Sequence, residues 1–337
     1  MNSDPNRQRR TAPPVPFAHE LTAALDALGP PRRGAPGSLD GIPAWRARLA
    51  ESDPSLEQLR DEGRFEIQEF LAPGPHGAPD IPVLFARPTG LRPQAPVVYH
   101  MHGGGMIGGT HRTGLREILQ EWAEPLELAV VSVGYRLAPE DPYPAAIEDC
   151  YAGLEWLVRH AGMLGIDPGR IVIAGGSAGG GLTASLALMT RDRNGPRILG
   201  QLMMCPMLDD RNDSVSAEQM AGRGVWDRHA NDLGWTALLG EQRSGEQLSG
   251  YAAAARATDL SRLPPAYIDA GAAETYRDEC VAYARRVWEA GGDAELHIWA
   301  GGFHGFDQLV PHADVSRDAR RTRFRWLCRV LNRPRRP

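Results

Sequence analysis

The sequence predicts an α/β fold in which a mostly parallel sheet is flanked by helices. From residue 128 onward, short apolar segments rich in β-branched residues alternate with segments of helical length. Glycine-rich turns follow several of the apolar segments, and a chain of 337 residues is long enough to bury a large core. Alternation of this kind builds parallel sheets covered by helices on both faces, with ligands bound at the carboxyl ends of the strands.

The individual elements follow in chain order. An antiparallel pair of strands is predicted at residues 65–71 and 81–87, and buried strands at 96–101 and 128–134. Further helices are predicted at 145–160, 178–191, 277–290 and 314–331, and further strands at 170–174, 199–205, 265–271 and 294–299. Residues 207–259 interrupt this alternation, because they are polar and lack a strong strand pattern. We interpret them as an inserted helical cap.

The α/β core is therefore expected to comprise residues 61–206 and 260–337. The N-terminal segment, residues 1–60, is rich in proline and arginine over its first forty positions and is expected to be partly mobile. Residues 19–28 have helical spacing, so we expect part of this segment to fold over a binding site and contribute to the cap.

Composition excludes several classes of mechanism. All 37 basic residues are arginine, which excludes a phosphate-binding loop with lysine, a Schiff-base lysine and a Ser-Lys dyad. The 42 acidic residues give a net charge of −5, so the arginines at 317–329 are interpreted as a solvated helix face and not as a nucleic-acid surface. The four cysteines are far apart, which argues against a disulfide framework or a thiolate metal site.

No apolar run reaches the roughly 20 residues that a membrane span needs, and the N-terminus lacks the apolar stretch of a secretory signal. We therefore expect a cytoplasmic protein that does not associate with membranes.

A nucleophile is predicted at Ser177. It lies in Gly-Gly-Ser-Ala-Gly at 175–179, between an apolar strand and a helix. Small residues on both sides of a serine let the chain turn sharply, so that the hydroxyl stands at the end of the sheet. A second glycine-rich segment, His-Gly-Gly-Gly at 102–105, also follows an apolar strand. The two segments together indicate one acyl-transfer site.

A serine nucleophile needs a base, and an acid that orients the base. His304 is the best candidate for the base because it lies in a glycine-rich loop after the last strand, whereas His297 falls within a strand pattern. Glu274, at the end of a strand, is the preferred acid. Asp278 remains an alternative, although carboxylates in the first turn of a helix are commonly stabilised by the helix dipole.

These motifs resemble those of the hormone-sensitive-lipase-like carboxylesterases, also called bacterial family IV, within the α/β-hydrolase fold. The resemblance covers roughly residues 60–332. It rests on the segments at 102–105, 135–140, 143–146, 175–180, 276–279 and 304–306. It implies a triad of Ser177, Glu274 and His304, an oxyanion hole formed by backbone amides of Gly103, Gly104, Gly105 and Ala178, and no metal or organic cofactor.

The chain departs from the family pattern at two positions. Gly176 precedes the serine, where the family usually has an acidic residue, and Glu274 stands where the family most often has aspartate. The second departure leaves room for Asp278 as the acid.

The expected function is hydrolysis of short to medium acyl esters through an acyl-enzyme. The expected partner is a small-molecule ester, and the resemblance favours a homodimer. Met106, Leu208, Trp226 and Trp235 are predicted to line an apolar substrate pocket. Amides, lactones or acetylated natural products remain alternative substrates of the same triad, and a non-catalytic ligand receptor of the same fold is a further alternative.

Overall fold

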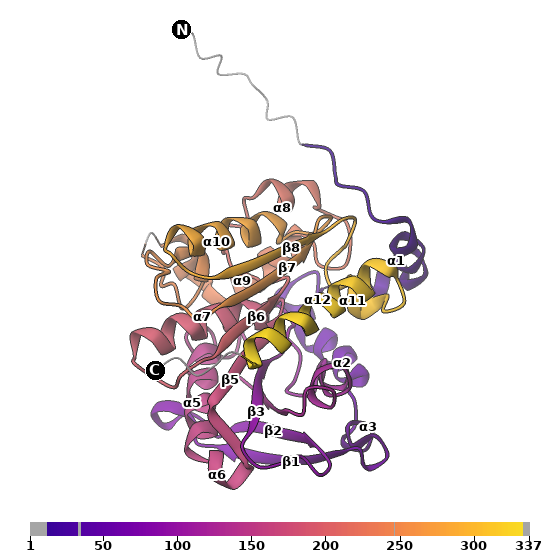
Figure 1. The fold of residues 1–337 in the computed structure, drawn as a ribbon. Helices are drawn as coiled ribbons and strands as arrows, with labels where there is room; N and C mark the ends of the chain where they lie inside the picture. Colours follow the sequence, from indigo (N-terminus) through magenta and orange to yellow (C-terminus); the bar gives the residue numbers. More distant parts are fainter. Residues whose placement is uncertain (1–11, 33–34, 246, 333–337) are drawn as a thin grey trace.

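A mixed sheet of eight strands organises the computed structural model, which describes residues 12–32, 35–245 and 247–332 (Figure 1). The strand order is β1-β2-β4-β3-β5-β6-β7-β8. β1 is antiparallel to β2 and β2 to β4, whereas all other neighbours are parallel. The strands are β1 Phe65–Ala72, β2 Ile81–Pro88, β3 Ala95–Met101, β4 Ala129–Val133, β5 Ile166–Gly176, β6 Gly200–Met204, β7 Ala266–Gly271 and β8 Ala294–Trp299. The predicted α/β class and the antiparallel first pair are confirmed.

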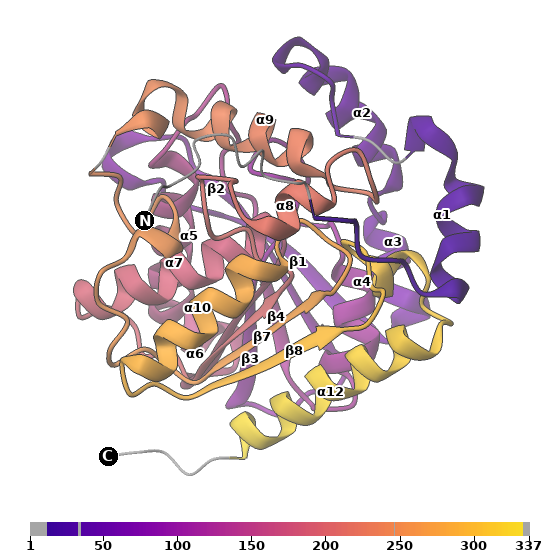
Figure 2. The same cartoon turned by 90° about the horizontal axis from the view of Figure 1, so that it is seen from above.

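Helices cover both faces of this sheet (Figure 2). One face packs against α5 Ala145–Arg159, α7 Ala178–Asp192 and α10 Arg277–Glu289 through a large apolar cluster. The other face packs against α3 Leu56–Arg60, α4 Leu115–Ile118 and α12 Asp314–Leu331 through a second cluster. Amphipathic helices on both sides leave the parallel strands buried, as their continuous apolar runs require.

The strand register aligns the carboxyl ends of the central strands. Met101 of β3 pairs with Gly175 of β5, and Gly176 pairs with Met204 of β6. Gly271 of β7 pairs with Trp299 of β8. The loops after β3, β5, β6, β7 and β8 therefore leave the same edge of the sheet, where sites of open α/β sheets form.

The N-terminal segment is largely helical where it is described. Leu21 and Leu25 of α1 His19–Arg32 belong to a cluster with Phe303 and Phe306. In α2 Ile42–Ser52, Arg46 donates hydrogen bonds to the carbonyls of Ile107 and Ala138, both at 2.6 Å. This segment is expected to be partly mobile, and its residues 1–11 and 33–34 lie outside the described residues.

Residues 207–259 contain α8 Val215–Gln219, α9 Arg228–Leu239 and the 3-10 helices Gly240–Ser244 and Ala254–Arg256. The helical content agrees with the expectation for this insertion. Its role as a cap stays a prediction.

The differences from the sequence-based expectation include two regions. β5 begins at Ile166, four residues before the predicted strand, because Ile166 pairs with Ala95 of β3. A segment without a predicted element forms α4 and then a π-helical turn, Leu119–Ala123. The first change lengthens the pairing with β3, and the second adds apolar residues to the cluster on the α12 side of the sheet.

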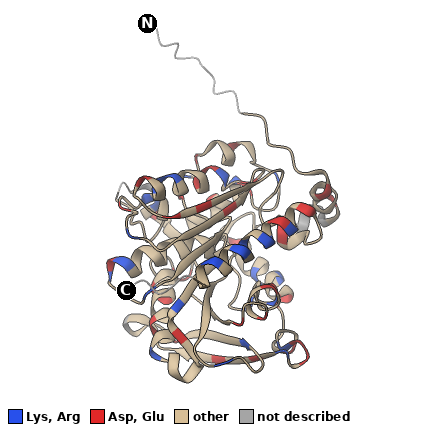
Figure 3. Cartoon of the chain, viewed as in Figure 1, with Lys and Arg blue, Asp and Glu red and all other residues tan. Residues whose placement is uncertain are grey.

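α12 carries six arginines and two acidic residues, Asp314 and Asp318, both within its first five positions (Figure 3). Five of the arginines pair with carboxylates, namely Arg317, Arg320, Arg321, Arg323 and Arg329. Arg323 is buried, so the predicted solvated face describes only part of this helix. Among the described residues, we find no helix that combines the length and apolarity of a membrane span.

Candidate active site

Ser177 lies at the sharp turn between β5 and α7. Its backbone has φ 57° and ψ −121°, which is strained for a residue with a side chain. The turn fits because its neighbours are glycines: a Cβ on Gly179 would lie 2.0 Å from the carbonyl oxygen of Met101. The close approach of the first turn of α7 to β3 leaves the Ser177 hydroxyl at the edge of the sheet, on the wall of a cavity.

A chain of hydrogen bonds connects Ser177 to two other side chains. His304, in the loop after β8, places Nε2 3.0 Å from Ser177 Oγ. Its Nδ1 lies 2.6 Å from Oε2 of Glu274, in the loop after β7. The other oxygen of Glu274 accepts a hydrogen bond of 2.6 Å from the Gly271 amide. The buried Glu274 side chain is therefore fixed at both oxygens, and it orients the imidazole toward Ser177.

Asp278 lies apart from this chain of contacts. Its Oδ2 accepts a hydrogen bond of 2.8 Å from the Ser216 amide, and its Oδ1 accepts one of 2.7 Å from Arg277. Its carboxylate holds α8 against the start of α10. The structure thus brings Glu274, and not the alternative acid, to His304.

The surroundings of His304 favour its charged form. Burial opposes that form, but the hydrogen-bonded Glu274 carboxylate favours it, and the pKa of His304 is raised well above its ordinary value. The pKa of the Cys205 thiol is itself raised by burial, so the thiol is neutral and the carboxylate supplies the negative charge. An imidazolium formed during a reaction is therefore stabilised here.

The glycine segment after β3 is held by His102. Its ring stacks on Tyr135 at a centroid distance of 4.1 Å, and the Tyr135 hydroxyl donates a hydrogen bond of 2.7 Å to the His102 carbonyl. Burial lowers the pKa of His102 to about 4, so the ring is neutral. Gly103, Gly104 and Gly105 line the cavity beside Ser177, and Ala178 is the first residue of α7.

The cavity has a volume of about 310 Å³. Ser177, His304 and the glycines at 103–105 line it, together with Trp226, as predicted for that residue. The other three predicted pocket residues do not line it. Trp235 and Leu208 are fully buried in the core, and Met106 lines a separate small cavity beside α7. The prediction was wrong for these three. Leu208 is buried because the chain after β6 turns inward, where the Leu208 amide donates to Glu279.

Sequence analysis did not identify several residues that line the cavity. Trp45 and Leu49 of α2 contribute to it, and the rings of Trp45 and Trp226 lie 6.3 Å apart. The helical spacing noted in the N-terminal segment pointed to α1, which instead packs behind the His304 loop. Cys205 and His100 line the cavity as well, and no sequence motif marks them.

Among the described residues, Cys205, Glu274 and His304 form one group of metal-ligating types, with ligand atoms within 4.8 Å of one another. Two of its three members are already hydrogen-bonded to each other. All four cysteines are free thiols.

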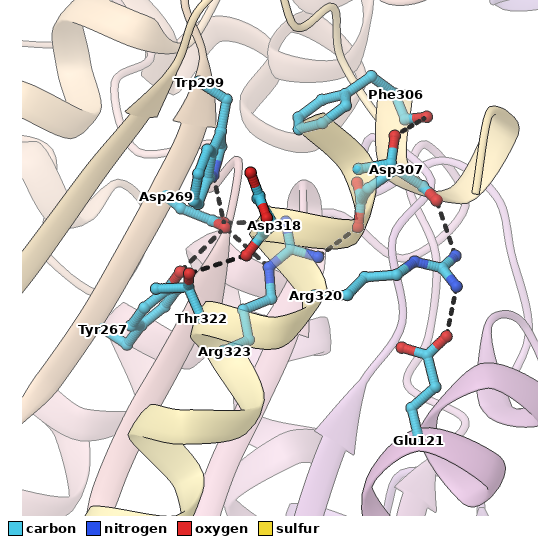
Figure 4. A network of polar contacts seen from close by, with 11 residues as sticks. Glu121, Tyr267, Asp269, Trp299, Phe306, Asp307, Asp318, Arg320, Thr322 and Arg323 are labelled. Carbon is cyan, nitrogen blue, oxygen red and sulfur yellow. Dashed lines mark hydrogen bonds and ion pairs between the residues drawn. The ribbon is translucent and has the colours of Figure 1, made fainter. Parts of the chain in front are cut away.

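A buried ionic network supports the loop that carries His304 (Figure 4). Arg323 of α12 donates to Asp269 at the end of β7, at 2.8 Å, and also to Asp307, three residues after His304. Arg320 binds the carbonyl of Asp307 at 2.7 Å and pairs with Glu121. The network joins β7, α11 Phe306–Leu309 and the π-helical turn near the carboxyl edge of the sheet.

Comparisons with known proteins agree with this geometry. The family model for the alpha/beta hydrolase fold matches residues 98–308. Carboxylesterase NlhH of Mycobacterium tuberculosis is 37% identical over 282 residues, which cover 81% of this chain and 86% of that protein. Human hormone-sensitive lipase is 38% identical over 105 residues, 31% of this chain and 10% of that protein.

The chain belongs to the hormone-sensitive-lipase-like family of α/β-hydrolases.

The solved structure of a bacterial heroin esterase superimposes on this family member with a TM-score of 0.86 and 35% identity, covering 94% of this chain and 98% of that one. Its carboxylesterase and esterase relatives identify this α/β-hydrolase as a carboxylic ester hydrolase.

Proposed function

We propose that this carboxylic ester hydrolase cleaves short to medium acyl esters through a triad of Ser177, His304 and Glu274. The observation that carries the proposal is the continuous contact from Glu274 to His304 to Ser177, which ends at the wall of the cavity. Nucleophile, base and orienting acid at these distances match the requirements of acyl transfer.

In the proposed reaction, His304 Nε2 takes the Ser177 proton while Oγ attacks the ester carbonyl carbon. Glu274 stabilises the imidazolium that forms. Backbone amides of Gly103, Gly104, Gly105 and Ala178 donate to the developing oxyanion, each donor being worth about 3 to 4 kcal/mol in related sites. The imidazolium then protonates the leaving alcohol, and an acyl-enzyme on Ser177 remains.

Deacylation repeats these steps with water. His304 takes a proton from the water while the water oxygen attacks the acyl carbonyl. The tetrahedral intermediate then collapses as His304 returns the proton to Ser177 Oγ, which releases the acid and restores Ser177. Ser177 directly precedes α7, so the oxyanion forms close to the N-terminus of this helix. The positive end of the helix dipole therefore favours the oxyanion in both halves of the reaction.

The test is hydrolysis of p-nitrophenyl esters from acetate to decanoate by the wild type and by Ser177→Ala and His304→Ala. We expect nitrophenol release by the wild type, a chain-length optimum at or below about eight carbons, and loss of activity in both variants. A mass increase equal to the acyl group, seen in the wild type after rapid acid quench and absent in Ser177→Ala, would identify the acyl-enzyme. A folded wild type inert on all these esters would contradict the proposal and favour amides, lactones or ligand binding alone.

A further inference from the structure

Three residues lie at or next to the carboxyl ends of adjacent strands, on the α12 side of the sheet. They are His100 of β3, Gly176 of β5 and Met204 of β6. Each follows by two positions a residue of the apolar cluster on that side, Val98, Ala174 or Leu202, so it lies on the same face. All three line the cavity that contains Ser177. They form a floor that begins directly beside the nucleophile.

Gly176 leaves space above this floor. A Cβ built on it would have Met204 Cε as its nearest neighbour, at 3.8 Å, an ordinary van der Waals distance. Its φ lies outside the left-handed region, so the backbone does not require glycine here. The backbone would therefore accept a side chain at residue 176, and its absence enlarges the cavity.

The opposite wall is apolar. It consists of Ile118 of α4, Trp122 of the π-helical turn and Leu309 of α11, all of which line the cavity. Ile118 and Trp122 are buried. We refer to the space among His100, Gly176, Met204, Ile118, Trp122 and Leu309 as the inner arm.

The charges near the inner arm are already neutralised (Figure 4). Arg320 and Arg323 also line the cavity, and each pairs with a carboxylate, Glu121 and Asp307 respectively. Glu117, the remaining acidic lining residue, is exposed to solvent. Burial lowers the pKa of His100 to about 3, so its ring is neutral in the arm. A charged ligand group would lose hydration here without gaining a free counter-ion.

We propose that the missing side chain of Gly176 opens the inner arm as a binding subsite for an unbranched, uncharged alkyl group of the ester, supplied by its acyl or its alcohol half. The proposal rests on the proposed esterase function and adds the class of group that the subsite binds. Apolar walls remove such a group from water at little cost, so each buried methylene favours binding.

The experiment measures kcat/KM in two ester series. One lengthens the acyl group of p-nitrophenyl esters from acetate to octanoate, and the other lengthens the alkyl alcohol of acetate esters, followed by pH-stat. Wild type is expected to gain up to about fourfold per methylene in one series, the rate equivalent of ~0.8 kcal/mol. The series that shows the gain identifies the half that occupies the arm.

Gly176→Leu is expected to remove this gain while p-nitrophenyl acetate is still hydrolysed, and Gly176→Ala to reduce it partly. Because residue 176 adjoins the nucleophile, Leu309→Trp narrows the arm from the opposite wall and should likewise remove the gain. Gly162→Leu, whose Cβ would meet no atom within 4 Å, is the matched control and should keep the wild-type profile. A chain-length profile that Gly176→Leu and Leu309→Trp both leave unchanged, or lower equally for every ester, overturns the proposal.

Charge provides a second test. With p-nitrophenyl hexanoate as the reference, we expect the ω-amino and ω-carboxy analogues of that ester to show at least about tenfold lower kcat/KM, because neither terminus finds a free counter-ion. Faster hydrolysis of either charged analogue would overturn the inference. Loss of all ester hydrolysis in wild type would contradict the proposed function instead, so the two failures are distinguishable.

Discussion

Replacement of Glu274 by glutamine tests which carboxylate orients the base. Glutamine is isosteric and can still accept the hydrogen bond from the Gly271 amide through its carbonyl oxygen. Its NH₂ group would then face Nδ1 of His304, in place of the carboxylate oxygen that lies 2.6 Å away. An amide donor favours the tautomer with the proton on Nε2, which cannot accept the Ser177 proton.

The expected loss in kcat is about 10³ to 10⁴, equivalent to roughly 4 to 5.5 kcal/mol of transition-state stabilisation. Glu274→Asp keeps the charge on a side chain one methylene shorter and should recover part of this loss. Asp278→Asn is the matched control. It should change kcat by less than about threefold, because that carboxylate binds Ser216 and Arg277 and does not contact His304.

The pH profile adds an independent readout. The pKa of His304 in the wild type is raised above 6.5, so activity falls as pH decreases through a value above 6.5. Glu274→Gln removes the negative charge that stabilises the imidazolium, and the acidic limb of its residual kcat/KM profile should move to lower pH. The reasoning is refuted if Glu274→Gln keeps kcat within tenfold of the wild type while Asp278→Asn loses activity.

Two further substitutions test the supports of the site. Gly105→Ala adds a Cβ at a residue with φ 61°, and this Cβ would lie 2.3 Å from the Trp226 ring. The kcat for p-nitrophenyl acetate should therefore fall at least about tenfold. Gly90→Ala is the control and should leave kcat unchanged, because Gly90 has a similar φ of 78° but lies in open space. Arg323→Leu leaves two buried carboxylates unpaired and should lower the free energy of unfolding in urea by about 3 to 5 kcal/mol at pH 7. Burial raises the pKa of Asp269, and protonation removes its charge. The loss of unfolding free energy caused by Arg323→Leu should therefore become smaller as pH falls. A loss that becomes larger at low pH would contradict this account.

Much of the fold was predictable from local pattern. Continuous apolar runs mark strands buried on both faces, and the spacing of apolar residues marks the helices that cover them. The start of β5 was misplaced because pairing with Ala95, and not local hydrophobicity, extends that strand to Ile166. The π-helical turn at Leu119–Ala123 carries no periodic pattern that distinguishes it from a loop.

By itself, the sequence determined the α/β class and the position of Ser177 between a strand and a helix, because glycines on both sides of a serine at such a junction permit one sharp turn. It also narrowed the acid to two carboxylates four positions apart. Only the tertiary structure separated them, since Glu274 meets His304 and Asp278 meets α8. Only the tertiary structure, likewise, shows that Trp45 lines the cavity and that Trp235 is buried in the core. The physical reason is that a glycine turn is a property of the local chain, whereas contacts between distant segments depend on how whole elements pack.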